Sequence, residues 1–235
     1  MKSIIMLSCL QLTLLIVILK MNLGEACVCM PMHPQQHYCR ADFVIKGKIL
    51  VDDLKVLSDN DTKMKADNDT STPNMRMYKV RIEKIFKGQE LMGPKKHAEI
   101  MVSRLGETCG MPLQENEVYV LTGRQMKNMY TVNMCDWVRK YSHLSRKQRQ
   151  GIRHLYKQYC DSCQIRPCFH GNCQATTPNT CIWNVSGRML NNNELDCESD
   201  YSRCIKDGAG CKWYMPQTMK ECMQRRVQMR HNRIP

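Results

Sequence analysis

The stretch Cys27-Val28-Cys29-Met30-Pro31-Met32-His33-Pro34-Gln35-Gln36, with Cys39 shortly after it, decides the fold. It directly follows Met1–Ala26, which has a basic start, an apolar run over residues 4–19 and small residues near its end. These features are typical of a cleaved secretory signal. Cleavage after Ala26 makes Cys27 the first residue of the mature protein, with a free α-amino group. An uncleaved signal anchor is the alternative, although polar residues interrupt the apolar run.

The cysteine count and the charge indicate a secreted, disulfide-bonded protein. The chain has 235 residues, 15 cysteines and a formal net charge of +13. Removal of residues 1–26 leaves 209 residues, 14 cysteines and a charge of +12. An even number of cysteines behind a signal peptide predicts a disulfide framework and an extracellular location. No long apolar run follows residue 26, so the sequence predicts no membrane span.

Three Asn-x-Ser/Thr triplets agree with secretion, and they make Asn60, Asn68 and Asn184 candidate glycosylation sites. The first two lie in residues 52–74, which are rich in Asp, Asn, Thr and Ser. We expect this stretch to form a long exposed loop, where a glycan is tolerated.

The first half of the chain has the pattern of a small β-barrel. Alternating apolar and polar residues predict five short strands at residues 43–49, 78–83, 98–103, 117–122 and 129–134. Five short strands suit a closed barrel of the OB type.

Two further local patterns concern helices. Residues 144–159 have helical spacing, and Ser145 with Gln148 forms a plausible capping box at the start. Pro31 and Pro34, in contrast, predict that residues 27–39 are extended rather than helical.

The composition changes after Cys160. Eight cysteines fall within residues 160–211, and apolar periodicity is poor there. Such a small unit must rely on disulfides for its stability. We therefore predict a signal peptide at 1–26, a barrel domain at 27–160, and a disulfide-rich subdomain at 161–235 whose basic tail includes a short helix.

The cysteine spacings resemble those of the tissue inhibitors of metalloproteinases. Cys27-x-Cys29-x-Pro31-x-His33-Pro34-Gln35, with Cys39, resembles the mature amino terminus of that family. Further similar segments are Cys109-Gly110, Cys135-Asp136-Trp137, the series Cys160, Cys163, Cys168 and Cys173, then Cys181-Ile182-Trp183, Cys204-Ile205-Lys206 and Cys211-Lys212-Trp213-Tyr214. The resemblance covers nearly all of residues 27–214. Cys197 and Cys222 lie outside the family's usual twelve cysteines, which suits an invertebrate-type member with one extra pair.

The resemblance implies a mainly β fold: an OB-type five-stranded barrel with helices, the netrin-like module, followed by a small disulfide-rich β unit. It also implies the disulfides Cys27–Cys109, Cys29–Cys135, Cys39–Cys160, Cys163–Cys211, Cys168–Cys173 and Cys181–Cys204. Cys197 and Cys222 are then the two cysteines left, and we infer that they pair with each other.

The function that the resemblance implies is inhibition of secreted zinc metalloproteinases, of the matrix metalloproteinase or adamalysin type, in a one-to-one complex. The protein would be no enzyme and would have no cofactor of its own. The α-amino and carbonyl groups of Cys27 would chelate the catalytic zinc of the target. The residues implied to contact the protease are Val28, Cys29, Met30, Pro31, Glu107, Thr108, Cys109 and Gly110. Val28 stands where the family usually has Thr or Ser.

Plainer interpretations accompany these predictions. Cys27, Cys29 and Cys39 could simply staple a strand, and Cys160, Cys163, Cys168 and Cys173 could form a zinc ribbon. His33 is interpreted as a turn residue that hydrogen-bonds near Pro34. A catalytic cysteine requires a free thiolate, and the pairing scheme leaves none.

The excess of basic over acidic residues has two interpretations. It is either ordinary solvated surface or a patch for sulfated matrix polysaccharide, near Arg139-Lys140, Arg146–Arg153 and the tail. The alternative function is accordingly a secreted cysteine-rich matrix-binding or signalling module without inhibition. A secreted enzyme ranks last, and nucleic acid is not expected as a partner outside the cell.

Overall fold

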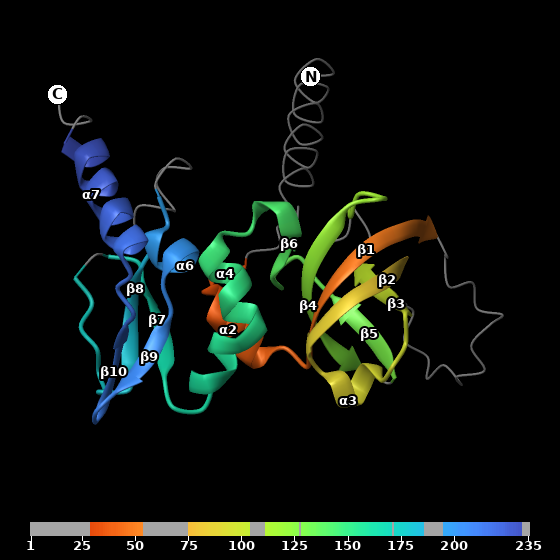
Figure 1. Ribbon diagram of the computed structural model, residues 1–235, viewed down its shortest axis with the longest axis horizontal. Helices are drawn as coiled ribbons and strands as arrows, with labels where there is room; N and C mark the ends of the chain where they lie inside the picture. The colour runs from red at the N-terminus through yellow and green to blue at the C-terminus, as the bar shows by residue number, and fades with distance from the viewer. Residues whose placement is uncertain are drawn as a thin grey trace, which may run out of the picture.

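The computed structural model describes residues 29–53, 75–103, 111–126, 128–170, 172–185 and 195–231. Its larger sheet forms a closed five-stranded barrel at one end of the molecule (Figure 1). The barrel strands are β1 (Phe43–Asp53), β2 (Met75–Lys87), β3 (His97–Ser103), β4 (Val118–Met126) and β5 (Met129–Val132). The strand order is β1-β2-β3-β5-β4, and pairing of β1 with β4 closes the barrel. The prediction of a mainly β, OB-type fold is therefore confirmed.

The pairing within the barrel is mixed. β3 and β5 are parallel, with Ile100 opposite Tyr130, and the other neighbours are antiparallel. Between β1 and β2 the register shifts at three places. Such bulges bend and twist a strand, which helps a short sheet to close on itself. The same strands run longer than their alternation predicted, because pairing continues into polar residues.

Alternation along the strands fills the barrel interior. Phe43, Ile45 and Ile49 of β1 are fully buried there, with Tyr78 and Val80 of β2. Short connecting elements lie around the barrel: α3 (Gln89–Met92), β6 (Val138–Lys140) and η1 (Tyr141–His143). β6 pairs antiparallel with residues 119–121 of β4.

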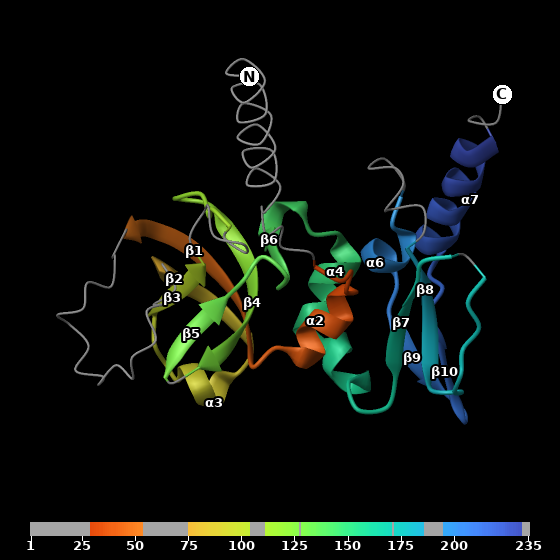
Figure 2. The same ribbon diagram turned by 180° about the vertical axis from the view of Figure 1, so that it is seen from behind.

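A second apolar cluster joins the barrel to a layer of helices. Val44 and Val120 point outward from the barrel and pack with Tyr38, Ile152 and Tyr156. The helices are α2 (Pro34–Arg40), α4 (Arg146–Gln150), the π-helical turn η2 (Gly151–Leu155) and η3 (Tyr156–Tyr159). In both ribbon views α2 and α4 lie between the barrel and the carboxy-terminal part (Figures 1 and 2). The residues that precede α2 are therefore connected to β1 of the barrel through a helix of this layer.

One helix was predicted correctly and one was missed. The helix over 146–159 begins as expected, with the Ser145–Gln148 capping box in place. The prediction that residues 27–39 exclude a helix is wrong for α2. Pro34 is the first residue of that helix, where a missing N–H costs nothing. His33 caps the helix, and Gln36 completes a capping box with it.

The carboxy-terminal part contains two small sheets and two helices. β7 (Gln164–Cys168) and β8 (Thr180–Asn184) form a parallel pair, and β9 (Cys204–Asp207) forms a hairpin with β10 (Gly210–Trp213). The helices are α6 (Cys197–Tyr201) and α7 (Gln217–His231). The tail thus carries a helix longer than the short one expected. The division of the chain into domains near residue 160 stays a prediction.

Six disulfides hold these elements. They are Cys29–Cys135, Cys39–Cys160, Cys163–Cys211, Cys168–Cys173, Cys181–Cys204 and Cys197–Cys222. These are the pairs that the resemblance and the two remaining cysteines imply. Cys27–Cys109 lies outside the described residues and stays a prediction.

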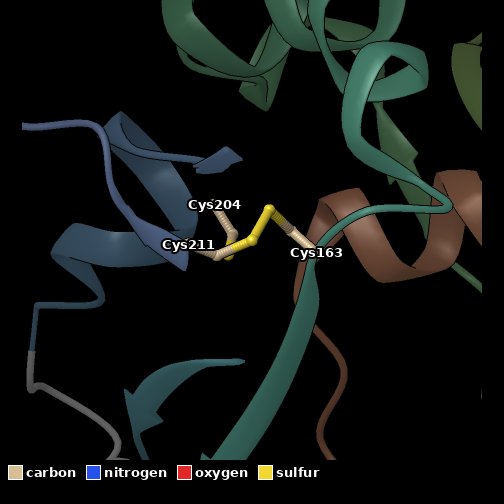
Figure 3. Close-up of side chains that lie close together, drawn as sticks. All are labelled: Cys163, Cys204 and Cys211. Atoms are coloured by element: carbon tan, nitrogen blue, oxygen red, sulfur yellow. A yellow bond between two sulfur atoms is a disulfide. The ribbon is translucent and has the colours of Figure 1, made fainter. Parts of the chain in front are cut away.

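The sulfur atoms of Cys163, Cys204 and Cys211 lie within 4.8 Å of one another, a spacing compatible with metal ligands (Figure 3). Cys163 and Cys211 are bonded to each other, however, and Cys204 is bonded to Cys181. Zinc is bound by cysteine thiolates, and a disulfide leaves none. The same reasoning excludes the zinc-ribbon interpretation, because all four of its cysteines are in disulfides.

Candidate functional site

The candidate site is the extended segment Cys29–His33, which precedes α2. Its start is fixed by the Cys29–Cys135 disulfide, whose Cα atoms are 5.2 Å apart. Met30 directly after it is 64% exposed, and Met134 beside the partner cysteine is 38% exposed. Two flexible thioether side chains therefore flank the disulfide at the surface. Sequence reasoning selected Met30 but missed Met134, which becomes a neighbour only through the disulfide.

The loop that carries Cys135 is held by its own hydrogen bonds. The Asn133 amide donates to Asp136 Oδ2 (2.8 Å), and the Cys135 amide donates to Asn133 Oδ1 (2.8 Å). The Trp137 amide donates to Thr122 Oγ1 on β4 (2.8 Å). Burial raises the pKa of the Asp136 carboxyl. Cys29 is thus attached to a loop that is itself tied to the barrel.

His33 holds the other end of the segment. Its ring is fully buried, and Nδ1 accepts a hydrogen bond from the Gln35 amide (3.1 Å). Since Nδ1 is the acceptor, Nε2 carries the proton and donates to the backbone oxygen of Glu198 (3.0 Å). The interpretation of His33 as a turn residue near Pro34 accounts for the bond from the Gln35 amide, but not for the bond to Glu198. The second bond spans 165 residues and has no local signal in the sequence.

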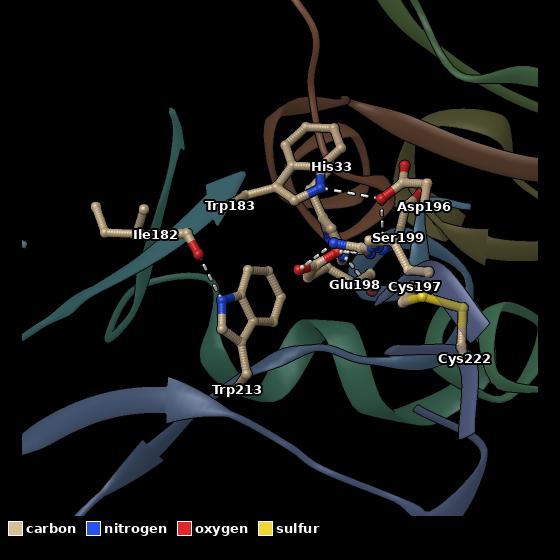
Figure 4. Close-up of polar contacts among 10 residues, drawn as sticks. His33, Ile182, Trp183, Asp196, Cys197, Glu198, Ser199, Trp213 and Cys222 are labelled. Carbon is tan, nitrogen blue, oxygen red and sulfur yellow. Dashed lines mark hydrogen bonds and ion pairs between the residues drawn. A yellow bond between two sulfur atoms is a disulfide. The ribbon is translucent and has the colours of Figure 1, made fainter. Parts of the chain in front are cut away.

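Two tryptophans enclose the His33 ring (Figure 4). Trp183 packs against it edge-on at 5.5 Å between centroids, and Trp213 lies at 5.1 Å. Each indole N–H is used: Trp183 donates to Asp196 Oδ1 (3.0 Å) and Trp213 donates to the Ile182 oxygen (2.7 Å). The histidine therefore sits in a rigid aromatic pocket of the carboxy-terminal part.

The two glutamines that follow extend this contact. Gln35 exchanges two hydrogen bonds with the backbone of Cys204, at 3.0 and 2.8 Å. Gln36 donates to the Ile165 oxygen (2.7 Å) and accepts from the His33 amide (3.0 Å). Sequence reasoning missed these roles, because the partners lie on distant strands. The result is an amino-terminal segment whose order is imposed before any partner binds.

The end of α2 is anchored as well. Cys39 is bonded to Cys160, and Lys87 Nζ donates to the backbone oxygens of Tyr38 (3.1 Å) and Cys39 (2.8 Å). These carbonyls are at the end of the helix, where a cation is favourable. Burial lowers the pKa of Lys87.

Comparison with known proteins identifies the family. A family model described as "Tissue inhibitor of metalloproteinase" matches residues 25–213. Metalloproteinase inhibitor 3 of Gallus gallus is 32% identical over 194 residues, which cover 81% of this chain and 82% of that protein. The chain belongs to the tissue inhibitor of metalloproteinase family. Members of this family are inhibitors rather than enzymes.

Other relatives agree with this assignment. Metalloproteinase inhibitor 4 of Mus musculus is 31% identical over 196 residues, covering 81% of each chain. The tissue inhibitor of metalloproteinase of Drosophila melanogaster is 27% identical over 211 residues, covering 85% of this chain and 87% of that protein. The match to the family model ends at residue 213, so α7 lies beyond it.

Several predicted site residues of this family member lie outside the described residues. They are Cys27, Val28, Glu107, Thr108, Cys109 and Gly110, together with the sequons at Asn60 and Asn68. Asn184 is described and ends β8, where its register partner is Cys168. Its glycosylation stays a prediction. Along the described part of the chain, the helices are too short or too polar to cross a membrane.

His37 should make this family member sensitive to acid. Burial, with smaller contributions from the neighbouring His33 and Arg40, lowers the pKa of His37 to about 4. The unfolded chain binds a proton near pH 6.5 and the folded chain does not, so stability falls as pH drops from 6.5 towards 4. We expect a loss of about 3 kcal/mol from this group across that window.

The measurement is the free energy of unfolding by denaturant between pH 4 and 7. His37→Gln should remove this part of the pH dependence, and the difference between the two proteins isolates it from titrating carboxylates. Parallel curves for both proteins would contradict the assignment.

Proposed function

We propose that the mature chain, beginning at Cys27, is a secreted inhibitor of zinc metalloproteinases of the matrix metalloproteinase or adamalysin type. Family membership supports the class of target. One structural observation carries the mechanism. Residues 29–33, with Met30 exposed between half-buried neighbours, are fixed at one end by Cys29–Cys135 and at the other by the buried ring of His33. Binding by such a segment costs little further ordering.

Cys27 supplies the chemistry in this proposal. A catalytic zinc keeps one coordination position for water. The α-amino nitrogen and the carbonyl oxygen of Cys27 can displace that water and close a five-membered chelate ring. An ordinary α-amino group has a pKa of about 7.7–8.0, so part of it is neutral near pH 7, and the metal competes with protons for the rest. The sulfur takes no part, because it is proposed to be bonded to Cys109.

The neighbouring residues would fill the active-site cleft. Val28 would enter the pocket beside the zinc, with the shape of threonine but without its hydroxyl. Met30 and Pro31 would lie further along the cleft, and residues 107–110 would add a second strip of contacts. Met30 and Met134 can adapt to different surfaces because a methionine side chain is unbranched and polarisable.

The test is a titration of a matrix metalloproteinase catalytic domain with the refolded mature protein. We expect complete inhibition at one equivalent, and competition with a small hydroxamate, since both would occupy the zinc. Inhibition unaffected by the hydroxamate would contradict the chelate. An absence of inhibition with several such enzymes would favour the matrix-binding or signalling alternative.

A group of cations supports polysaccharide binding as a second function. Lys46 Nζ lies 4.6 Å from the centre of the Tyr141 ring, and the Arg149 guanidinium lies 5.2 Å from it. Arg153 donates to the Tyr141 hydroxyl (3.1 Å). Tyr141 thus gathers cations from a strand and a helix, near the exposed Arg139 and Arg146. We propose that this basic patch binds sulfated matrix polysaccharide.

The patch prediction is tested on immobilised heparin. Arg139→Gln with Arg146→Gln should weaken binding about twofold to tenfold, the range for two exposed charges, and lower the salt concentration at elution. Lys220→Gln with Arg225→Gln is the matched control, because it removes two cations from exposed positions of α7. Equal shifts in both variants would indicate only a response to net charge.

A further inference from the structure

Helix α7 lies beyond the family match and is attached to the body at two neighbouring points. Cys222 is bonded to Cys197 of α6, and both residues are fully buried. Four residues further along α7, Arg226 forms a bidentate ion pair with Glu198, at 2.5 and 3.2 Å. Adjacent residues of α6 therefore hold positions one turn apart on α7. This pair of links, here called the α6–α7 clamp, fixes both the separation and the rotation of the two helices.

The ion pair of the clamp is almost dry. The side chains of Glu198 and Arg226 are only 10% and 11% exposed. Removing one partner of such a pair leaves a buried charge without its counterion, which is strongly destabilising. The clamp therefore selects one arrangement of α6 and α7 rather than adding general surface stability.

Helix α6 needs this support because it has only five residues. A helix of this length is not stable alone. Yet its backbone oxygens serve as acceptors for distant parts of the chain: Ser199 accepts from Gln148 Nε2 (3.1 Å), and Asp200 accepts from Ser145 Oγ. Glu198 accepts from His33 Nε2 (3.0 Å). The position of α6 thus decides where these oxygens lie.

Glu198 contacts both α7 and the amino-terminal segment. Its carboxylate binds Arg226 of α7. Its backbone oxygen holds His33 at the end of the segment Cys29–His33 (Figure 4). We propose that Glu198 and Arg226 are positioning residues for inhibition, and that α7 acts through them to hold the amino-terminal segment in its binding geometry. This inference rests on the proposed function and gives α7 a part in it.

A purely structural clamp would stabilise the carboxy-terminal part without reaching His33. The two cases are separated by a double-mutant cycle. Glu198→Gln with Arg226→Met removes both charges together, so that no unpaired charge is buried, and the Cys197–Cys222 disulfide keeps α7 attached. His33→Asn retains a good helix-capping side chain but is too short to keep the Nε2 bond.

The first readout is hydrogen exchange at the amides of Gln35, Gln36 and His37, and the second is the rate of dissociation from a matrix metalloproteinase. We expect the charge-removed clamp to speed both by about threefold to tenfold, the factor of one hydrogen bond. In the His33→Asn background, the same change should add nothing. Equal effects in both backgrounds, or unchanged exchange at these amides, would overturn the proposal.

Two controls complete the design. Asp207→Asn removes the exposed Lys212–Asp207 ion pair of the same part of the protein and should leave both readouts unchanged. Arg226→Lys keeps the charge but not the bidentate geometry, so it should speed both readouts in the same direction by a smaller factor. It replaces the charge-removed variant in the test if that variant folds poorly. Hydrogen exchange requires no protease, so it tests the clamp even if the proposed inhibition fails.

Discussion

One alanine added before Cys27 is expected to abolish inhibition of a matrix metalloproteinase. The added residue converts the α-amino group into an amide, whose nitrogen is a poor metal ligand, and it places extra atoms where the zinc would lie. Loss of an outer-shell partner of a metal already costs about 10–100-fold, so loss of a direct ligand should raise the inhibition constant by at least about 10³-fold. By the usual conversion, this is about 4 kcal/mol or more of binding free energy.

The measurement compares two refolded proteins that differ by that alanine alone. Circular dichroism and the heparin elution profile should be the same for both, because the barrel, the disulfides and the basic patch are unchanged. Only inhibition should differ. If both proteins inhibit with similar constants, the chelate is wrong and the contact must lie elsewhere on the surface. If neither inhibits but both bind heparin, the matrix-binding alternative gains support.

The barrel could be predicted from the sequence because its signal is local. Tyr78 and Val80 alternate with charged residues, and a period of two places them on one face of a strand. The strand lengths could not be predicted, since β1 and β2 continue through polar residues that pair only after the barrel closes. Register shifts between these strands likewise depend on closure rather than on any residue pattern.

Helix α2 shows how a rule can be applied at the wrong position. Pro34 suggests against a helix by the general rule for helix interiors, yet it occupies the first helical position, where proline is favoured. The cap is a histidine, which is not among the side chains usually expected there. Gln36 at the third helical position is the sequence signal for a capping box. The signal is incomplete because the capping residue is His33 rather than serine or threonine.

The contacts of His33 could not be read from the sequence at all. Glu198 and Cys204 lie 165 and 169 residues away from their partners in the amino-terminal segment. The acceptors are backbone oxygens, so no residue type reveals them. The extra cysteine pair was accessible by contrast, because the other twelve cysteines were assigned and two remained. The Cys197–Cys222 pair indicates that residue 222 is attached to the rest of the carboxy-terminal part. The ion pair of Arg226 with Glu198 has no such signal in the sequence.

Removal of the Cys29–Cys135 disulfide is expected to weaken both stability and inhibition. Its cysteines are 106 residues apart, but Cys39–Cys160 shortens the path between them to roughly 35 residues, and the proposed Cys27–Cys109 pair shortens it to roughly 28. Closing a loop of that size contributes about 3–4 kcal/mol in the chain-entropy description. We expect a loss of this order in the free energy of unfolding of the Cys29→Ser, Cys135→Ser protein.

Inhibition by the same variant should weaken by about 30- to 150-fold, because two or three residues after Cys27 must then be ordered on binding at about 1 kcal/mol each. The matched control is Cys168→Ser with Cys173→Ser, which opens a loop of 5 residues in another part of the fold. Its inhibition constant should stay close to that of the native protein. Equal inhibition by both variants would mean that His33 and its pocket alone fix the segment, and that the disulfide serves the barrel instead.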